Sequence, residues 1–208
     1  INFNTIVLKD TLNNSGTVTG KLYQRGLANF KYDFDVVTNN MLLLDTKPKD
    51  NSMFYGRAIG KARLTFKGPE NDMRLGLEAE VTDTSAVAIR TNTTDQGSDV
   101  DYIVFKQYGT EIKSDNNLRN QLSVDLDLRA NNKAQVSVIL DDLTGDVIDA
   151  VGEGRLQIKI PAKGSMTMNG RYNIDGGRYA FNFQSFIRKP FDLKANAGNY
   201  IEWKGNPY

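Results

Sequence analysis

Apolar and polar residues alternate along most of the chain with a period of two, as in a β-strand that has one face in water. The clearest runs are residues 30–36, 54–66, 73–81, 122–129 and 134–140. Turn residues such as Gly68-Pro69 and Asn131-Asn132 separate neighbouring runs. The pattern predicts an all-β chain that is built mostly of antiparallel meanders.

The segment SMTMNGRYNIDGGRYAFNFQS, residues 165–185, contains Asp175-Gly176 between two alternating runs. This arrangement predicts a hairpin with a two-residue loop, in which Tyr172 pairs with Tyr179. The aromatic residues then share one face and the arginine and asparagine residues the other. Because no basic residue is interleaved on the aromatic face of this hairpin, we interpret that face as apolar lining rather than as a platform for bases or sugars.

Two architectures fit strands that have one apolar and one polar face. In a β-sandwich, two sheets bury their apolar faces against each other, and the alternation alone favours this solution. The alternative is one long sheet that is curled so that its apolar face lines a groove. About fifteen strands spaced about 4.8 Å apart would make an uncurled sheet about 70 Å long.

Composition narrows the functional classes. The 208 residues show no shift in composition that would divide them, so we predict one elongated domain over residues 1–208. The 26 basic and 25 acidic residues give a formal net charge of +1, which indicates neither nucleic acid nor an anionic membrane surface as partner. The chain opens directly in a strand-like run, which is typical of a fragment of a larger protein. Any membrane anchor is therefore expected outside this fragment.

The chain contains neither histidine nor cysteine. This removes the commonest general base, the usual zinc ligands and every Ser-His or Cys-His nucleophile pair. We therefore predict a protein that is not an enzyme and that needs no cofactor or metal.

Two acidic groups could be mistaken for functional sites. Residues 141–146 are rich in carboxylates, but they lack the alternating spacing and the closing glutamate of an EF-hand loop, so a polar turn is expected. Asp125 and Asp127 have the appearance of a glycosidase pair, but they fall on the polar face of an alternating strand. Outside the strands, residues 91–101 are predicted to form a long loop and residues 115–121 a short helix.

The final third carries more specific motifs. In order, these are Thr144-Gly145-Asp146, Gly152–Gly154, Gly170-x-Tyr172 leading into Asp175-Gly176-Gly177-x-Tyr179, Lys189-Pro190-Phe191, and Ile201-x-Trp203-x-Gly205-Asn206-Pro207-Tyr208. This ordered set resembles the C-terminal domain of the TamB family, within the AsmA-like envelope proteins of diderm bacteria. Residues 136–208 resemble it best, residues 54–69 resemble the upstream repeats more loosely, and residues 1–50 match only in style.

The resemblance implies an elongated periplasmic protein that spans between the inner membrane, which holds its anchor, and the outer membrane. It implies a single sheet folded into an apolar-lined trough, a β-taco, and so favours the curled sheet over the sandwich. The implied function is to hold phospholipid acyl chains and help move phospholipid between the two membranes. The implied partner is an outer-membrane BamA-like barrel of the TamA type near the C-terminal end. The alternative function is an assembly or docking module that adds a strand to outer-membrane β-barrel proteins.

On this hypothesis, the apolar residues of the alternating runs in the second half of the chain line the lipid groove. The predicted lining residues are Leu122, Val124, Leu126, Leu128, Val136, Val138, Leu140, Leu156, Ile158, Ile160, Met166, Met168, Tyr172, Tyr179, Phe181, Phe183, Phe191, Ile201 and Trp203.

Overall fold

The computed structural model describes residues 1–26, 28–51, 53–82, 85–91, 106–107, 110–111, 121–141, 143–183 and 187–205. These residues form fourteen β-strands and no helix, so the all-β prediction is confirmed. The predicted loop at residues 91–101 and the predicted helix at residues 115–121 lie outside the described residues, apart from Thr91 and Gln121 at their ends.

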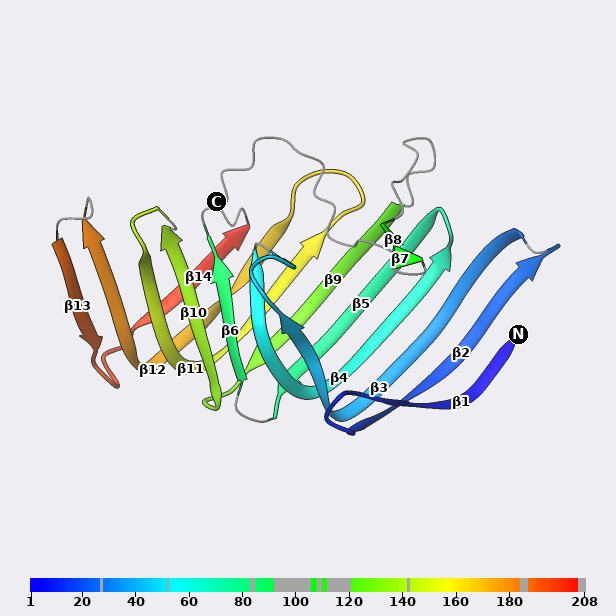
Figure 1. The fold of residues 1–208 in the computed structure, drawn as a ribbon, viewed down its shortest axis with the longest axis horizontal. Coiled ribbons are helices and arrows are strands. Elements are labelled where there is room, and N and C mark those ends of the chain that lie inside the picture. The colour runs from blue at the N-terminus through cyan, green and yellow to red at the C-terminus, as the bar shows by residue number, and fades with distance from the viewer. Residues whose placement is uncertain are drawn as a thin grey trace.

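Alternating residues form strands of very different lengths. The strands are β1 (Asn2–Lys9), β2 (Ser15–Arg25), β3 (Ala28–Thr46), β4 (Phe54–Pro69), β5 (Asp72–Val81), β6 (Ser85–Arg90), β7 (Lys106–Gln107), β8 (Thr110–Glu111), β9 (Gln121–Ala130), β10 (Ala134–Asp141), β11 (Asp146–Ile160), β12 (Thr167–Phe183), β13 (Ile187–Leu193) and β14 (Tyr200–Gly205). The short strands β7 and β8 pair only with each other, and the other twelve strands form one sheet (Figure 1).

Several strands share one row of the sheet. β5 and β6 follow each other along the same edge of β4, and β9 and β10 do so along β11. β13 and β14 likewise share the edge of β12. The sheet therefore has nine rows, namely β1, β2, β3, β4, β5 with β6, β9 with β10, β11, β12, and β13 with β14. Nine rows about 4.8 Å apart extend roughly 38 Å, so the expectation of fifteen rows and 70 Å was wrong.

Neighbouring rows are antiparallel with one exception, because β5 and β6 run parallel to β9 and β10. Antiparallel rows follow from short turns between sequential strands, which is the meander that the alternation predicts. The parallel pair joins the half of the sheet formed by residues 1–90 to the half formed by residues 121–205. This long-range pairing makes the two halves one continuous sheet.

The sheet is bent along a line that we call the crease. The regular ladder is interrupted at 38–44 in β3, between the end of β5 at Val81 and the start of β6 at Ser85, at 131–133 between β9 and β10, at 151–152 in β11, and at 194–199 between β13 and β14. Hydrogen bonds from Thr82 N to Ile59 O (3.2 Å) and from Asn131 Nδ2 to Val81 O (2.5 Å) join the interruptions of adjacent rows. In Figure 1 the long strands curve at the lower edge of the molecule, where the crease runs.

The crease divides the sheet into two walls. The first wall contains β1, β2, β5, β9 and β14 with the adjoining parts of β3, β4, β11 and β12. The second wall contains β6, β10 and β13 with the remaining parts of β3, β4, β11 and β12. A single curled sheet, not two separate sheets, therefore provides both walls, as the resemblance implied.

The predicted hairpin at Asp175-Gly176 is wrong, because both residues lie inside the continuous strand β12. Val151 pairs with Gly176 and Gly152 pairs with Ile174, so Asp175 is the extra residue of a β-bulge. A one-residue bulge exchanges odd and even positions just as a two-residue hairpin loop does. Tyr172 and Tyr179 therefore share a face in both arrangements, which is why the sequence pattern did not distinguish them.

The backbone beside the bulge requires glycine. Gly177 has a φ of 154°, and a Cβ at this position would lie 2.2 Å from the carbonyl oxygen of Asp149 on β11. A side chain would therefore push β12 away from β11 at the point where both strands cross the crease.

Deleting Asp175 tests the bulge. Without the extra residue, the apolar side chains beyond Gly176 would turn towards water, or the pairing with β11 would slip by one residue. We expect a loss of at least about 3 kcal/mol in the free energy of unfolding. It can be measured by urea unfolding with the fluorescence of Trp203, the one tryptophan. Deleting Lys163 in the exposed loop 161–165 is the control and should change stability by less than about 0.5 kcal/mol. Equal stability of the two deletions would contradict the role of the bulge.

Candidate functional site

The apolar side chains of the first wall form a continuous line that crosses the sheet from one strand to the next. We call this line of side chains the inner row. Register-paired residues of neighbouring strands share a face, so the row can be followed from one edge to the other. It consists of Ile6, Val18, Val36, Leu64, Leu77, Leu126, Ile158, Met168 and Gly205. We call the face that carries this row the inner face.

The second wall continues the same face beyond the crease. Its main row consists of Phe54, Ile89, Val138, Ile148, Tyr179 and Phe191. The inner faces of the two walls therefore form an apolar trough on one side of a single sheet.

The two walls pack against each other over the middle of the trough. The buried cluster there consists of Met53, Val136, Val138, Ala150, Ile158, Met166, Met168, Tyr172, Ile174 and Trp203. Val138 of the second wall has no exposed surface, and Met168 of the first wall is 3% exposed. In this segment the trough is filled by its own side chains, as the core of a sandwich would be.

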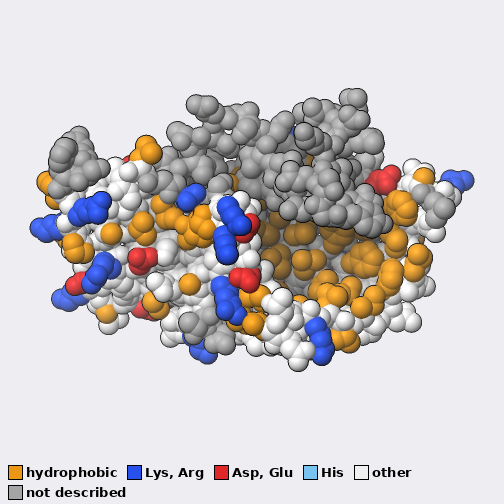
Figure 2. All heavy atoms as spheres, in the orientation of Figure 1, with side chains coloured by type: hydrophobic (Ala, Val, Ile, Leu, Met, Phe, Trp, Pro, Cys, Tyr) orange, Lys and Arg blue, Asp and Glu red, His pale blue; other side chains and the backbone are white. Residues whose placement is uncertain are grey.

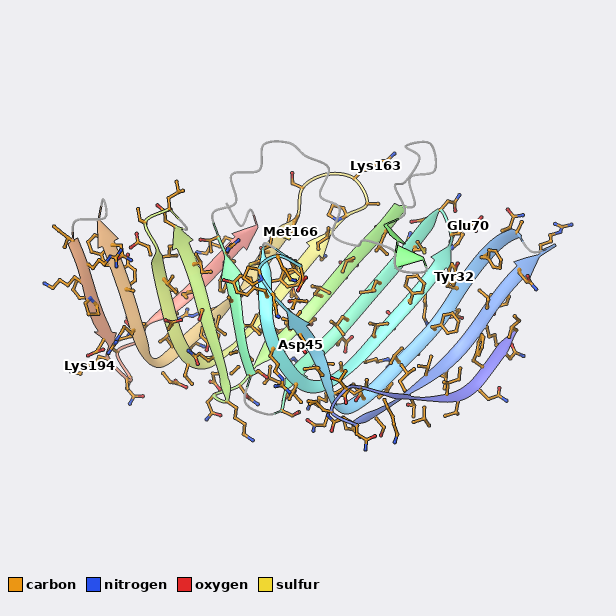
Figure 3. All side chains as sticks on the ribbon, viewed as in Figure 1. Tyr32, Asp45, Glu70, Lys163, Met166 and Lys194 are labelled. Carbon is orange, nitrogen blue, oxygen red and sulfur yellow. The ribbon has the colours of Figure 1, made fainter. Side chains whose placement is uncertain are left out.

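The part of the first wall near the N-terminus is more open. Partly exposed aromatic residues pair here, with the ring centroids of Phe3 and Phe34 5.5 Å apart and those of Tyr32 and Phe66 5.3 Å apart. Figure 2 shows hydrophobic side chains gathered on a hollowed surface over β2 to β5, at the right of the view. In Figure 3 the Tyr32 side chain projects from β3 on this side of the wall. We call this region the open segment of the inner face.

The structure brings the predicted lining residues together on the inner face. The strand registers align Leu122, Val124, Leu126, Leu128, Leu156, Ile158, Ile160, Met168, Tyr172, Ile201 and Trp203 on the first wall, and Val136, Val138, Tyr179, Phe181 and Phe191 on the second. Met166 precedes β12 and is buried in the cluster, and Leu140 packs against it. The backbone of Phe183 follows the same register, but its side chain lies outside the described residues.

The lining predicted from sequence omitted the N-terminal rows of the same face. Their register-aligned apolar residues are Phe3, Ile6, Val18, Leu22, Tyr32, Phe34, Val36, Phe54, Leu64, Phe66, Met73, Leu75, Leu77, Val87 and Ile89. The alternation in residues 30–36, 54–66 and 73–81 carried the signal for most of these positions. They belong to the site because the parallel pairing of β5 with β9 joins their rows to the C-terminal ones.

The opposite, outer face carries charged side chains in ion pairs. Lys67 Nζ lies 3.2 Å from carboxylate oxygens of both Asp33 and Asp35, and Arg155 Nε donates to Asp127 Oδ1 at 2.7 Å. The hydrogen bond from Arg155 holds the pKa of Asp127 below its usual value. A carboxyl group with a lowered pKa stays ionised, which does not suit the general acid of a glycosidase. Asp125 is exposed and Asp127 is held in an ion pair with Arg155, which is the arrangement expected of solvated charges on an outer face.

The described residues of the acidic segment, 141 and 143–146, lie in the turn between β10 and β11, as expected. Asp141 Oδ1 accepts hydrogen bonds from Leu143 N at 2.8 Å and Thr144 N at 3.4 Å, and Gly145 N donates to Asp141 O at 2.8 Å. No group of three acidic side chains among the described residues is arranged to hold a metal ion. The described part of the chain also contains no helix that is long and apolar enough to cross a membrane.

Tyr172 links the two walls from inside the trough. Its hydroxyl lies 3.3 Å from Ala134 O on β10 and 3.4 Å from Ala150 O on β11, both beyond the crease from its own position. Burial, with a smaller contribution from the negative charge of Asp175, raises the pKa of Tyr172 to about 12. The phenol is thus a buried neutral donor that holds the crease closed.

One sheet that is folded along a crease, apolar inside and charged outside, defines an open β-trough. Such a protein offers an extended apolar surface rather than a small catalytic pocket.

Comparison with known protein families shows to which family the chain belongs. The model of the TamB C-terminal domain matches residues 5–208, so the chain belongs to the TamB C-terminal domain family. The match extends the resemblance from the last third to nearly the whole chain, including residues 5–50. No curated protein and no solved structure matched the chain.

Membership places the chain in a known cellular setting. The TamB family belongs to the cell envelope of diderm bacteria and to its translocation and assembly module. Its domain is a non-catalytic structural or transport module that is associated with an outer-membrane partner of the TamA or BamA type.

The raised pKa of Tyr172 predicts how stability depends on pH. The unfolded phenol ionises near pH 10 and the folded one near pH 12, so the contribution to stability is complete below about pH 10 and is lost as the pH rises through 12. Two pKa units correspond to about 2.7 kcal/mol. The stability advantage of the wild type over Tyr172→Phe should therefore shrink by about 2 kcal/mol between pH 9 and pH 12, where the folded phenol is half ionised. Urea unfolding at each pH measures it, and parallel pH profiles would contradict the assignment.

Proposed function

We propose that the inner face binds phospholipid acyl chains in the periplasm and helps move phospholipid between the inner and outer membranes. The observation that supports this most strongly is the row from Ile6 to Gly205, in which eight of nine positions carry an apolar side chain and the ninth is glycine. Charged pairs such as Arg155 with Asp127 lie on the other face of the same strands.

The energetic reason is the cost of exposing hydrocarbon to water. Each exposed methylene costs about 0.8 kcal/mol, so a chain of about fifteen carbons costs roughly 12 kcal/mol if it crosses water unaided. An apolar surface that extends roughly 38 Å offers continuous contact instead. Backbone groups in the regular ladders of the sheet are already hydrogen-bonded, so acyl chains lying on these strands would leave few backbone groups without a partner.

The open and the packed segments would contribute differently. We assign resting lipid to the open segment, where inner-face residues such as Phe34 and Phe66 are partly exposed. In the packed segment, Val138, Met168 and Trp203 contact other side chains. These residues would line a lipid path when the walls part along the crease, so the two segments correspond to a binding region and a closed passage.

Adjacent valines on β3 provide a matched test. Val36 lies in the inner row between Val18 and Leu64, whereas Val37 lies on the outer face and is 46% exposed. Val36→Asp places a carboxylate where acyl chains would lie, and we expect about a tenfold loss of co-purified phospholipid. Val37→Asp is the control and should retain it. Mass spectrometry of lipid extracted from gently purified protein measures both, with circular dichroism to confirm folding.

Absence of phospholipid from the wild-type protein would refute the lipid-binding function. Equal lipid content in the two folded variants would show that the lipid is not held on the inner face.

A second candidate function, docking to an outer-membrane barrel by strand addition, is supported by the free edge at the C-terminal end. Within the described sheet, β13 and β14 pair with β12 alone, so their other edge is unpaired. Such an edge can accept or donate a strand.

Two exposed tyrosines allow the docking candidate to be tested. Tyr200 on β14 is 49% exposed beside the free edge, and Tyr23 on β2 is 47% exposed near the opposite end of the sheet, where it pairs with Lys31 of β3. With a photocrosslinking amino acid at either position, barrel adducts are expected from 200 and not from 23. Adducts of equal yield from both positions, or from neither, would argue against edge docking.

A further inference from the structure

The inner face carries one charged residue in the interior of its strands. Following the register through the described strands of the large sheet, only Lys189 on β13 places a charged side chain in the interior of an inner-face strand, opposite Phe181 on β12. Arg25 and Asp146 have the same parity but lie at hairpin ends. The sequence prediction that no basic residue joins the aromatic face holds for β12 alone, because β13 supplies Lys189.

A cluster of three aromatic rings lies beside this lysine. The centroid of the Tyr179 ring lies 6.0 Å from that of Phe181 and 6.3 Å from that of Phe191, and the latter two are 6.5 Å apart. Lys189 Nζ lies 5.5 Å from the centroid of Phe191, whose side chain is 43% exposed. The cluster is therefore a partly exposed aromatic surface with one cation at its side.

The cation has no carboxylate partner among the described residues. The nearest acidic group of the same parity, Asp146, accepts hydrogen bonds from Asn182 N at 2.5 Å and Thr144 Oγ1 at 3.1 Å. Arg178 and Asp192 pair with each other at 3.5 Å on the outer face. Lys189 is left with its ring contact and solvent.

We propose that Lys189, with Tyr179, Phe181 and Phe191, forms a seat for the phosphate of a phospholipid headgroup at the β13 edge of the trough. This inference rests on the proposed function and adds to it a headgroup site. The ammonium group would pair with the phosphate, while the acyl chains lie along Phe191 and Tyr179 towards Ile148, where the packed segment begins.

Charge and hydrogen-bonding capacity both favour a phosphate. An ammonium group beside apolar rings is less hydrated than one in open water, so its charge-assisted hydrogen bond to an anion is stronger. Tyr179 can add a second donor, since burial and the charge of Asp146 raise its pKa and keep the phenol protonated. Aromatic rings beside a cation are also typical of groups that lie at the boundary between hydrocarbon and water.

The test compares two short-chain lipids with identical acyl chains, phosphatidylglycerol and the uncharged diacylglycerol, by titration calorimetry. The wild-type protein should bind phosphatidylglycerol about tenfold more tightly, the effect of one charge-assisted contact. Lys189→Gln should remove this preference and leave diacylglycerol affinity unchanged, and Lys189→Arg should keep it. Arg188→Gln is the matched control, because Arg188 is the neighbouring cation on the outer face, opposite Asn182, and should retain the preference.

The outcomes separate this inference from the function on which it rests. Equal affinities for the two lipids, or an undiminished preference in a folded Lys189→Gln variant, overturn the headgroup seat while acyl binding stands. Failure of the wild type to bind either lipid overturns both. Inorganic phosphate alone should bind at least a hundredfold more weakly than phosphatidylglycerol, because it lacks the chains that supply most of the affinity. Equal affinity for inorganic phosphate would assign the site to the free ion instead.

Discussion

The structure depends on keeping the apolar side chains of every row on the same face while the sheet bends. Because strand side chains alternate, each interruption at the crease must restore the correct parity. The strands restore parity in different ways. In β11 the even-numbered residues, such as Ala150 and Gly152, face inward on both sides of the crease. In β12 the inward residues change from even-numbered, at Ile174, to odd-numbered, at Gly177, because Asp175 is an extra residue. The rows of the two walls therefore continue one inner face. Without this matching, charges from the outer face would interrupt it.

Packing and openness are distributed unevenly along this face. Where the walls meet, Val138, Met168 and Trp203 fill the space, and the Tyr172 hydroxyl reaches carbonyl groups beyond the crease. Towards the N-terminus the first wall keeps its apolar face partly exposed. Outer-face ion pairs, each worth at most about 1 kcal/mol, add little stability but keep the charge on one side. One sheet thus combines a core that stabilises the fold with an apolar surface that is free to bind.

The sequence was sufficient to predict the longer alternating strands and their apolar faces, because alternation is local. It did not show which runs share a row: residues 121–130 and 134–140 look like two strands of a meander, but both lie along β11. The hairpin at Asp175 was predicted wrongly because a bulge and a two-residue turn give the same parity. Lys189 was overlooked because its aromatic neighbours Tyr179 and Phe181 come from β12. Each error concerns pairing between segments, which residue patterns in one sequence do not contain.

The central claim is that the inner face of this TamB C-terminal domain is the surface that binds lipid. The most direct measurement is photocrosslinking in intact envelopes from consecutive positions 62–66 of β4, which alternate between the two faces. If the inner face binds lipid, phospholipid adducts are expected from positions 62, 64 and 66 and none from 63 and 65. Adducts of similar yield from all five positions, or from the odd positions alone, would contradict it.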